Sequence, residues 1–428
     1  MAGKSRLARF KFWTDLVVKL VVVSVLAAVA HRFYERHHQP LEIALILPLS
    51  GRNEAFGADL RDAYHLAINE INVEGGIKGR RIVARILDTQ SSSKVAREGV
   101  EDILEKEEVT AFFGCQTSSC RRAVLPAIQA ARHLLLYPGD YEGMEFPSHA
   151  FYTGSPPNQL ILPTLEWAIG ALGPKFFVVG IDDVYPRIGA ELIKRELEAL
   201  RGDLVGAHFV PPDTEDMTKV AQAIKRAAPN VVLSLTAGGT TPGLVHAMRA
   251  AGLNPNQFPT IHLWMGEDEI REVGAKELAG DYLAGSYFSS IDSEANQQFR
   301  QAYRERYGKN RQFGSFEESA YVSLKMWAAA VERGGSASPR RVLRALRGLH
   351  YEAPSGPVHL DRSNHHLWRF MRVGRIDDSG RVAVVWESDS PLEPLSYPIS
   401  GTQEEWDELL LNLNRKWRGN WAAPEAMR

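Results

Sequence analysis

The strongest constraint on the fold is an alternation of apolar runs with helix-period segments, which begins at Leu41 and occurs in two successive series. In the first series, residues 41–51 read as a strand ending in a Pro and Gly turn, and apolar residues over 60–71 then recur at helical spacing. The pattern restarts over residues 176–235, after a turn-rich join at 155–158 where a hinge can lie. Such alternation predicts an α/β fold of two Rossmann-like lobes, each a parallel sheet covered by helices, with a cleft between them.

The last part of the chain follows a different pattern. Residues 357–360, 368–376 and 381–387 read as short antiparallel strands, with a hairpin turn at 377–380. A T-x-x-E capping box over 402–405 then precedes apolar residues at helical spacing. This pattern predicts one amphipathic helix at the end of the chain, which docks on the body of the protein or on a partner.

The N-terminal segment has the layout of an export signal. Five basic residues and one acidic residue, Asp15, lie within residues 1–19. An apolar run over 20–30 follows them and ends in Ala-Val-Ala, a sequence that signal peptidase accepts. An uncleaved anchor stays open, although Asp15 and Lys19 interrupt the stretch over 13–30 and a membrane span needs about 20 apolar residues. We therefore predict a periplasmic protein in which residues 1–40 are a signal, or an inner-membrane anchor that contacts the bilayer through 13–30.

Composition excludes several classes of function. Lys and Arg number 50 against 52 Asp and Glu, so no basic excess exists to neutralise a nucleic-acid backbone. The two cysteines, Cys115 and Cys120, are too few for a cysteine-based zinc site. A disulfide between them in an oxidising compartment stays open, but we favour the unpaired state because a disulfide needs Cα atoms within about 7 Å. The histidine pairs at 37–38 and 365–366 are expected in solvated loops, where adjacent side chains point apart and share no metal.

No enzyme signature is present. The chain lacks the P-loop, the dinucleotide-binding G-x-G-x-x-G, the H-E-x-x-H and the G-x-S-x-G motifs. Cys115 follows a predicted strand and precedes a predicted helix, where a thiolate is stabilised, but we interpret it as a small buried residue. We therefore predict no catalytic residue, no cofactor and no metal site.

The candidate binding site lies where parallel strands end, because ligands of α/β sheets bind outside the carboxyl ends of the strands. Asn, Gln, Ser, Thr and Tyr in these loops offer the donors and acceptors that a small polar ligand needs. The same side chains can instead serve structure, with Ser118 as a helix cap and Tyr137 as a core residue. The candidate loops span residues 48–56, 114–119, 137–143, 182–187, 237–241 and 287–292.

Several motifs resemble a known family. The stretch LPLSGRNEAFGADLRDAYHLAINEINVEGGIKGRRI over 47–82 resembles the first lobe of type I periplasmic binding proteins of the branched-chain amino acid class. The motifs GCQTSSCRRAVLP, YPRIG, YFSSIDS, EESAY and APSGPVHLDRSNHH are similar to the urea and short-chain amide subgroup of ABC transporter substrate-binding proteins. The resemblance runs from residue 41 to residue 398.

The resemblance implies a clamshell in which the chain crosses three times between lobes. Residues 41–152 and 288–354 would form the first lobe, 153–287 and 355–398 the second, and 399–428 a tail helix outside the family pattern. The lobes would close on a urea-like, amide-like or amino-acid-like solute and deliver it to an ABC permease. The alternative is a ligand-sensing domain of an amide-responsive or membrane signalling system.

The resemblance also nominates binding residues. Ser118 and Tyr137 match the serine and tyrosine that hold the ligand in the subgroup. The chain departs from the subgroup at Gln116, Asp183 and near Gly139 and Gly239, which predicts a larger pocket for a donor-rich or cationic ligand. The full candidate set comprises Ser118, Tyr137, Gln116, Thr117, Gly139, Asp183, Tyr185, Gly239 and Thr240.

Overall fold

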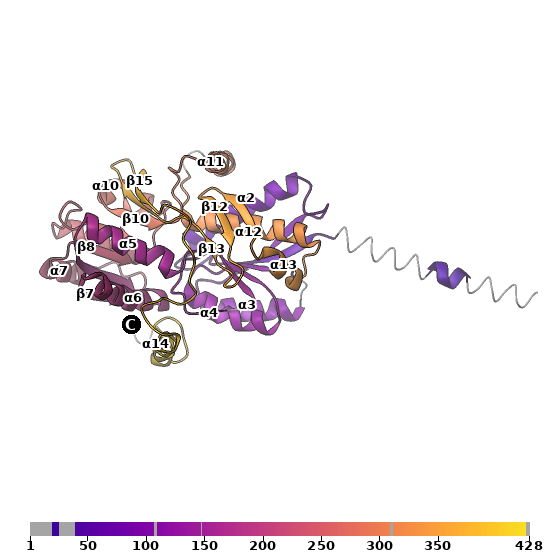
Figure 1. Ribbon diagram of the computed structural model, residues 1–428, viewed down its shortest axis with the longest axis horizontal. Helices are drawn as coiled ribbons and strands as arrows, with labels where there is room; N and C mark the ends of the chain where they lie inside the picture. Colours follow the sequence, from indigo (N-terminus) through magenta and orange to yellow (C-terminus); the bar gives the residue numbers. More distant parts are fainter. Residues whose placement is uncertain (1–18, 25–38, 107–108, 147, 309–310, 425–428) are drawn as a thin grey trace, which may run out of the picture.

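The computed structural model describes residues 19–24, 39–106, 109–146, 148–308 and 311–424, and it has two lobes side by side (Figure 1). Most of the predicted signal or anchor over 1–40 lies outside these residues, as does the histidine pair at 37–38. Within the described residues, no helix is long and apolar enough to cross a membrane.

The first lobe is built on a parallel five-stranded sheet of order β2-β1-β3-β4-β5. Six of the seven residues of its interior strand β1 are buried, because helices cover both faces. The strands are β1 (Leu41–Leu47), β2 (Ile82–Asp88), β3 (Phe112–Gly114), β4 (Leu135–Tyr137) and β5 (Ala150–Tyr152). The helices are α2 (Glu54–Val73), α3 (Ser93–Lys106), α4 (Ser118–Ala130), α11 (Glu294–Tyr307), α12 (Ser315–Gly334) and α13 (Pro339–Leu346).

The second lobe is built on a seven-stranded sheet of order β15-β14-β10-β9-β8-β6-β7, parallel except for an edge hairpin. Its strands are β6 (Lys175–Ile181), β7 (Asp203–Val210), β8 (Val231–Leu235), β9 (Thr260–His262), β10 (Tyr282–Gly285), β14 (Arg372–Ile376) and β15 (Val382–Glu387). Its helices are α5 (Pro157–Ala171), α6 (Val184–Leu200), α7 (Thr218–Ala227), α8 (Thr240–Ala250), α9 (Ile270–Val273) and α10 (Ala275–Leu278). The predicted hairpin turn at 377–380 is confirmed, since β14 and β15 pair across it.

A third, small antiparallel sheet consists of β11 (His350–Ala353), β12 (Gly356–Leu360) and β13 (Leu367–Trp368). The lobe boundary expected between residues 354 and 355 falls in the turn that joins β11 to β12. The chain enters the seven-stranded sheet later, at Arg372. The three crossings between the lobes therefore run through residues 153–156, 286–293 and 369–371.

Two buried arginines, Arg369 and Arg372, connect these crossings through ion pairs and hydrogen bonds. The Arg369 guanidinium pairs with Glu318 of α12 at 2.9 Å and also donates to the carbonyl of Thr153 in the first crossing. Arg372 donates to the carbonyls of Ser286 in the second crossing and of Ser355. The hinge is therefore a hydrogen-bonded unit rather than three independent linkers.

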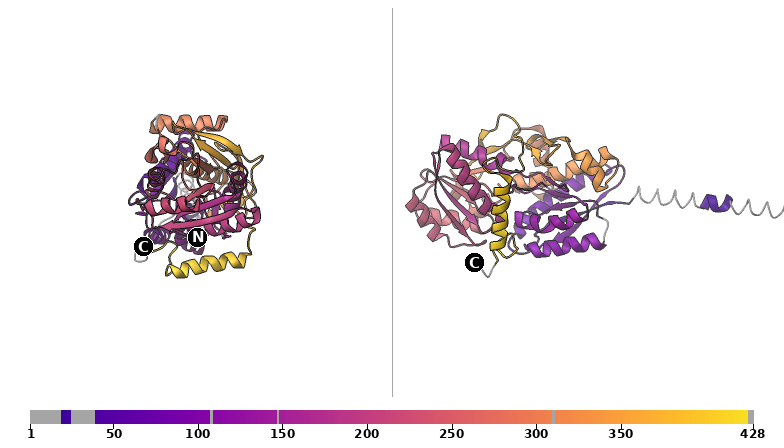
Figure 2. Two further views of the ribbon diagram at one scale, coloured as in Figure 1. Left: turned by 90° about the vertical axis from the view of Figure 1, so that its left-hand side faces the viewer. Right: turned by 60° about the horizontal axis from the view of Figure 1, so that its bottom comes forward.

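The C-terminal helix α14 (Gln403–Lys416) confirms the predicted amphipathic tail. Its capping box is present, with Thr402 Oγ1 accepting a hydrogen bond from the Glu405 amide at 3.3 Å. The helix docks on the body of the protein, where Trp406 is fully buried. Figure 2 shows α14 lying across the side of the molecule where the two lobes meet.

Two predictions about side chains were wrong. His365 and His366 are buried rather than solvated, because His366 stacks on Tyr152 and His365 stacks on Phe151. Burial lowers the pKa of His366 to about 3. Cys115 and Cys120 form a disulfide, since the loop that enters α4 brings their Cα atoms to 5.5 Å.

Replacing Cys115 and Cys120 together by serine is expected to lower the free energy of unfolding by about 2 kcal/mol, the loop-closure contribution of a short covalent ring. Denaturant titration under oxidising conditions measures this loss. Adding a thiol reductant to the wild-type chain should reproduce it, and a reductant that leaves the unfolding midpoint unchanged would contradict the expectation.

Candidate functional site

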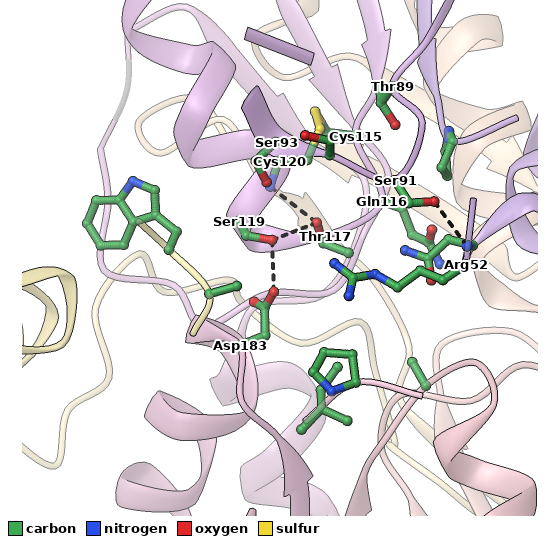
Figure 3. A pocket seen from close by; sticks show the side chains of 18 of the residues that line it. Arg52, Thr89, Ser91, Ser93, Cys115, Gln116, Thr117, Ser119, Cys120 and Asp183 are labelled. Carbon is green, nitrogen blue, oxygen red and sulfur yellow. Dashed lines mark hydrogen bonds between the residues drawn. A yellow bond between two sulfur atoms is a disulfide. The ribbon is translucent and has the colours of Figure 1, made fainter. Parts of the chain in front are cut away.

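A cavity of about 590 Å³ lies between the two lobes, within the size range of small-molecule sites (Figure 3). Its first wall comes from the loops that follow β1, β2 and β3, and its second wall comes from the second lobe. Residues of the C-terminal tail complete the lining. The main lining residues are Pro48, Arg52, Asn53, residues 89–94, Cys115, Gln116, Thr117, Ser119, Ile181, Asp183, Pro212, Asp213, Ala237, Trp264, Asn420, Trp421, Ala422 and Pro424.

The first-lobe wall is rich in hydroxyl groups and carries two basic residues. The loop over 89–94 contributes Ser91, Ser92 and Ser93, and its position is fixed by hydrogen bonds from the Asn53 amide to Ser91 Oγ and from Ser91 Oγ to the Ser50 carbonyl. The helices α3 and α4 both begin at this wall, so the positive ends of two helix dipoles lie beside it. Together with Arg52 and Lys94, they favour an acidic group on a ligand.

The second-lobe wall is centred on Asp183, the N-cap residue of α6. Burial raises the pKa of its carboxyl group to about 6, although the hydrogen bond from Ser119 opposes the shift. Ser119 Oγ, from the first lobe, donates to Asp183 Oδ2 at 2.8 Å. This bond joins the two lobes across the cavity, as Figure 3 shows.

Two acceptors of the lining lack a partner among the described residues. They are Gln116 Oε1 and Asp183 Oδ1, and both side chains are more than nine-tenths buried. A buried acceptor without a donor costs roughly 1–3 kcal/mol. An N–H or O–H donor of a ligand would satisfy either atom if it came within hydrogen-bond distance of it.

Ser118 and Tyr137 are buried but do not line this cavity. Arg121 of α4 occupies the space beside them, since its Nη1 donates to Ser118 Oγ at 2.9 Å and its guanidinium lies 4.9 Å from the centre of the Tyr137 ring. Glu142 accepts a hydrogen bond from Arg121 Nη2 at 2.9 Å and neutralises the buried cation. The Tyr137 hydroxyl donates to the Gln116 backbone carbonyl at 3.3 Å. The two residues that the resemblance nominates thus contact Arg121 and lie outside the lining of the cavity.

The structure brings three of the other candidates to the cavity and leaves four away from it. Gln116, Thr117 and Asp183 line the cavity. Tyr185 is buried and packs its ring edge against Trp264, with 5.2 Å between the ring centres, so it supports the wall from behind. The remaining candidates, Gly139, Gly239 and Thr240, lie outside the lining, and a Cβ at Gly139 would come within 2.6 Å of the Tyr137 hydroxyl.

Sequence reasoning missed several lining residues. The loop over 89–94 follows β2, so the rule that ligands bind at strand ends, which nominated the neighbouring loops, applies to it as well and could have identified it. Trp264 follows the short strand β9, which has only three residues and gives a weak apolar signal. The tail residues 420–424 carry no local signal for a binding role. Within the described part of the chain, no group of three or more His, Cys, Asp or Glu residues could hold a metal ion.

Comparison with curated proteins gives partial matches. The chain is 33% identical over 120 residues to a limonene hydroxylase of Geobacillus stearothermophilus, covering 28% of this chain and 22% of that protein. It is 26% identical over 216 residues to Leu/Ile/Val-binding protein homolog 6 of Brucella melitensis, covering 48% of this chain and 55% of that protein. The chain thus matches about a fifth and about half of the lengths of these two relatives.

Solved structures show the same fold at low identity. A solute-binding protein of an ABC transporter from R. palustris, in complex with 4-hydroxybenzoate, has a TM-score of 0.75 at 20% identity, over 83% of this chain and 98% of that one. A branched-chain amino acid transporter substrate-binding protein from Streptococcus pneumoniae, in complex with isoleucine, has a TM-score of 0.73 at 20% identity, over 81% of this chain and 99% of that one. The family model described as a periplasmic binding protein domain matches residues 41–403, so the chain belongs to the periplasmic binding protein family.

Proposed function

We propose that this protein is an extracytoplasmic solute-binding protein that captures a small polar molecule between its lobes and delivers it to an ABC importer. The observation that carries the proposal is the cavity between the lobes, lined by Gln116 and Asp183 with one unpartnered acceptor each. Membership of the periplasmic binding protein family supports the proposal, as does the similarity of the fold to solved structures of solute-binding proteins.

We further propose that the ligand is amino-acid-like. Arg52, Lys94 and the helix N-termini suit a carboxylate, whereas Gln116 and Asp183 suit an ammonium or amide donor. Apolar side chains in the lining, such as Ile181 and Trp264, can contact a nonpolar part of the ligand. Urea and short amides remain alternatives that the following screen separates.

A thermal-shift screen of the full-length protein against isoleucine, 4-hydroxybenzoate, urea and acetamide tests the proposal, because a ligand that binds only the folded state raises the melting temperature. A shift with isoleucine is the expected result. A shift with urea or acetamide alone would replace the amino-acid-like class by the amide class. An unchanged melting temperature with all four compounds would contradict the proposal in this form.

The affinity for a cationic or zwitterionic ligand is expected to rise as the pH increases through about 6. The reason is that burial holds the pKa of Asp183 near 6, and only the ionised carboxylate attracts an ammonium group. Binding in that range should release protons, because a bound cation favours the ionised form. Calorimetric titration with isoleucine at several pH values, in buffers of different ionisation enthalpy, measures both effects.

The Asp183→Asn variant is the matched control, because the amide keeps the shape of the side chain and removes its charge. We expect it to bind about tenfold more weakly at pH 8, the loss for a charged hydrogen bond, and to show no pH dependence between 5 and 8. A variant that keeps the wild-type pH profile would show that another group titrates.

A further inference from the structure

The C-terminal tail lies beyond the region that matches the family, which ends at residue 403, and it packs on the second lobe. The Arg195 side chain of α6 lies over Trp406 of α14, with 4.3 Å from the guanidinium to the ring centre. Arg195 also pairs with Glu405 at 3.0 Å, and the indole N–H of Trp406 donates to the Pro398 carbonyl at 3.1 Å. The helix is therefore fixed to this lobe.

After α14 the chain turns back towards the cavity. Gly419, with a φ of +84°, takes the left-handed conformation that the reversal requires. The following segment then pairs with the loop before α6, since the Val184 amide donates to the Trp421 carbonyl at 3.0 Å and the Ala423 amide donates to the Asp182 carbonyl at 3.0 Å. These two bonds flank Asp183, one of the residues that the second lobe contributes to the cavity.

The paired segment takes part in the lining of the cavity, to which Asn420, Trp421, Ala422 and Pro424 contribute. It is therefore a third wall, beside the walls that the two lobes supply. The backbone bonds to Asp182 and Val184 tie this wall to the second lobe.

Trp421 also contacts the first lobe. The guanidinium of Arg122, on α4, lies 4.8 Å from the centre of the Trp421 ring, within the range of a cation–π interaction. Arg122 is held in the first lobe by hydrogen bonds to Glu142 Oε1 at 2.5 Å and to the Gly143 carbonyl at 3.4 Å. The pair thus joins a residue fixed to one lobe to a residue fixed to the other.

We propose that residues 420–424 are a part of the ligand-binding site that the family pattern does not include, and that Trp421 latches the lobes closed by holding Arg122. The wall moves with Asp183, so the ligand, Asp183 and the indole ring come together when the lobes close. An aromatic wall favours a solute with a nonpolar or planar part over urea. The ligand-binding half of this inference rests on the proposed function, whereas the latch does not.

The latch is tested by the distance between the lobes in the full-length protein without added ligand. Spin labels at Glu98→Cys on α3 and Lys219→Cys on α7, both exposed positions, report this distance by double electron–electron resonance. The Trp421→Ala variant and a chain that ends after Lys416 are both expected to give a longer and broader distance distribution. Leu411→Ala, on the exposed face of α14, is the control and should leave the distribution unchanged. Unchanged distributions in both Trp421→Ala and the shortened chain would overturn the latch.

The wall is tested by calorimetric titration of the same variants with isoleucine, 4-hydroxybenzoate and urea. Trp421→Ala is expected to weaken binding of isoleucine or 4-hydroxybenzoate about five- to thirtyfold, mainly through faster dissociation. The affinity of Trp421→Phe should lie between those of the wild type and Trp421→Ala. Unchanged affinity in Trp421→Ala would overturn the wall and leave the solute-binding function standing. Longer distances in Trp421→Ala, with no binding of any probe to the wild type, would support the latch and count against the proposed function.

Discussion

The Arg369→Ala variant is expected to lose about 3–5 kcal/mol of unfolding free energy, because it leaves a buried carboxylate without its cation. Glu318 is fully buried, and its other oxygen accepts hydrogen bonds from the amide and hydroxyl of Ser355. Arg369 also donates to Ser319 Oγ at 3.0 Å and to the Thr153 carbonyl. One substitution therefore releases contacts from two of the three crossings between the lobes.

Urea denaturation measures this loss. The exposed pair of Lys106 and Asp102 supplies the control, since Lys106→Ala should cost no more than about 1 kcal/mol, as for other surface ion pairs. An Arg369→Ala midpoint as close to the wild type as that of the control would mean that the hinge does not depend on this buried pair.

The Glu142→Ala variant is expected to be destabilised by a similar amount, about 3–5 kcal/mol at pH 7. Glu142 is fully buried and accepts hydrogen bonds from Arg121 at 2.9 Å and from Arg122 at 2.5 Å, so its removal leaves two arginines short of counter-charge. Glu145, 2.6 Å from Arg121, compensates in part. Because Arg122 also holds Trp421, the variant should loosen the tail as well.

Lowering the pH should reduce the difference in unfolding free energy between the wild type and the Glu142→Ala variant. Burial by itself raises the pKa of the Glu142 carboxyl, but Arg121 and Arg122 together hold it at about 2, below the value of an unfolded glutamate. A lowered folded pKa gives stability that is present above the unfolded pKa and is lost as the pH falls from about 4.5 towards 2. Unfolding free energies measured at pH 7, 5 and 3.5 should show this narrowing, and a constant difference would contradict the assigned charge pairs.

The sequence was sufficient to predict the two lobes because the strands are buried on both faces. Continuous apolar runs such as residues 176–181 and 231–235 mark parallel strands directly, and both are present as β6 and β8. The tail helix was equally visible, because its capping box and apolar spacing are local signals. The burial of His366 was not visible, because it depends on Tyr141 and Tyr152 from a distant part of the chain.

The site was predicted only in part, because its lining also depends on contacts between distant segments of the chain. Strand ends identify loops but not which side chains face the cleft, and Arg121 decides the outcome for Ser118 and Tyr137 by filling the space beside them. No pattern within a single segment shows that an arginine will bond a glutamate twenty-one residues later. The contribution of residues 420–424 depends on pairing with a loop more than 200 residues earlier in the chain.

We propose that the solute binds in the cavity between the lobes, against Gln116 and Asp183. The most direct test is calorimetric titration of full-length Gln116→Ala and Ser118→Ala with the compound that gives the largest thermal shift. Gln116→Ala is expected to bind about tenfold more weakly, the loss of one buried hydrogen bond, and Ser118→Ala is expected to stay within about threefold of the wild type. The opposite order, with Ser118→Ala weak and Gln116→Ala unchanged, would place the ligand beside Ser118 and Tyr137 and contradict the claim.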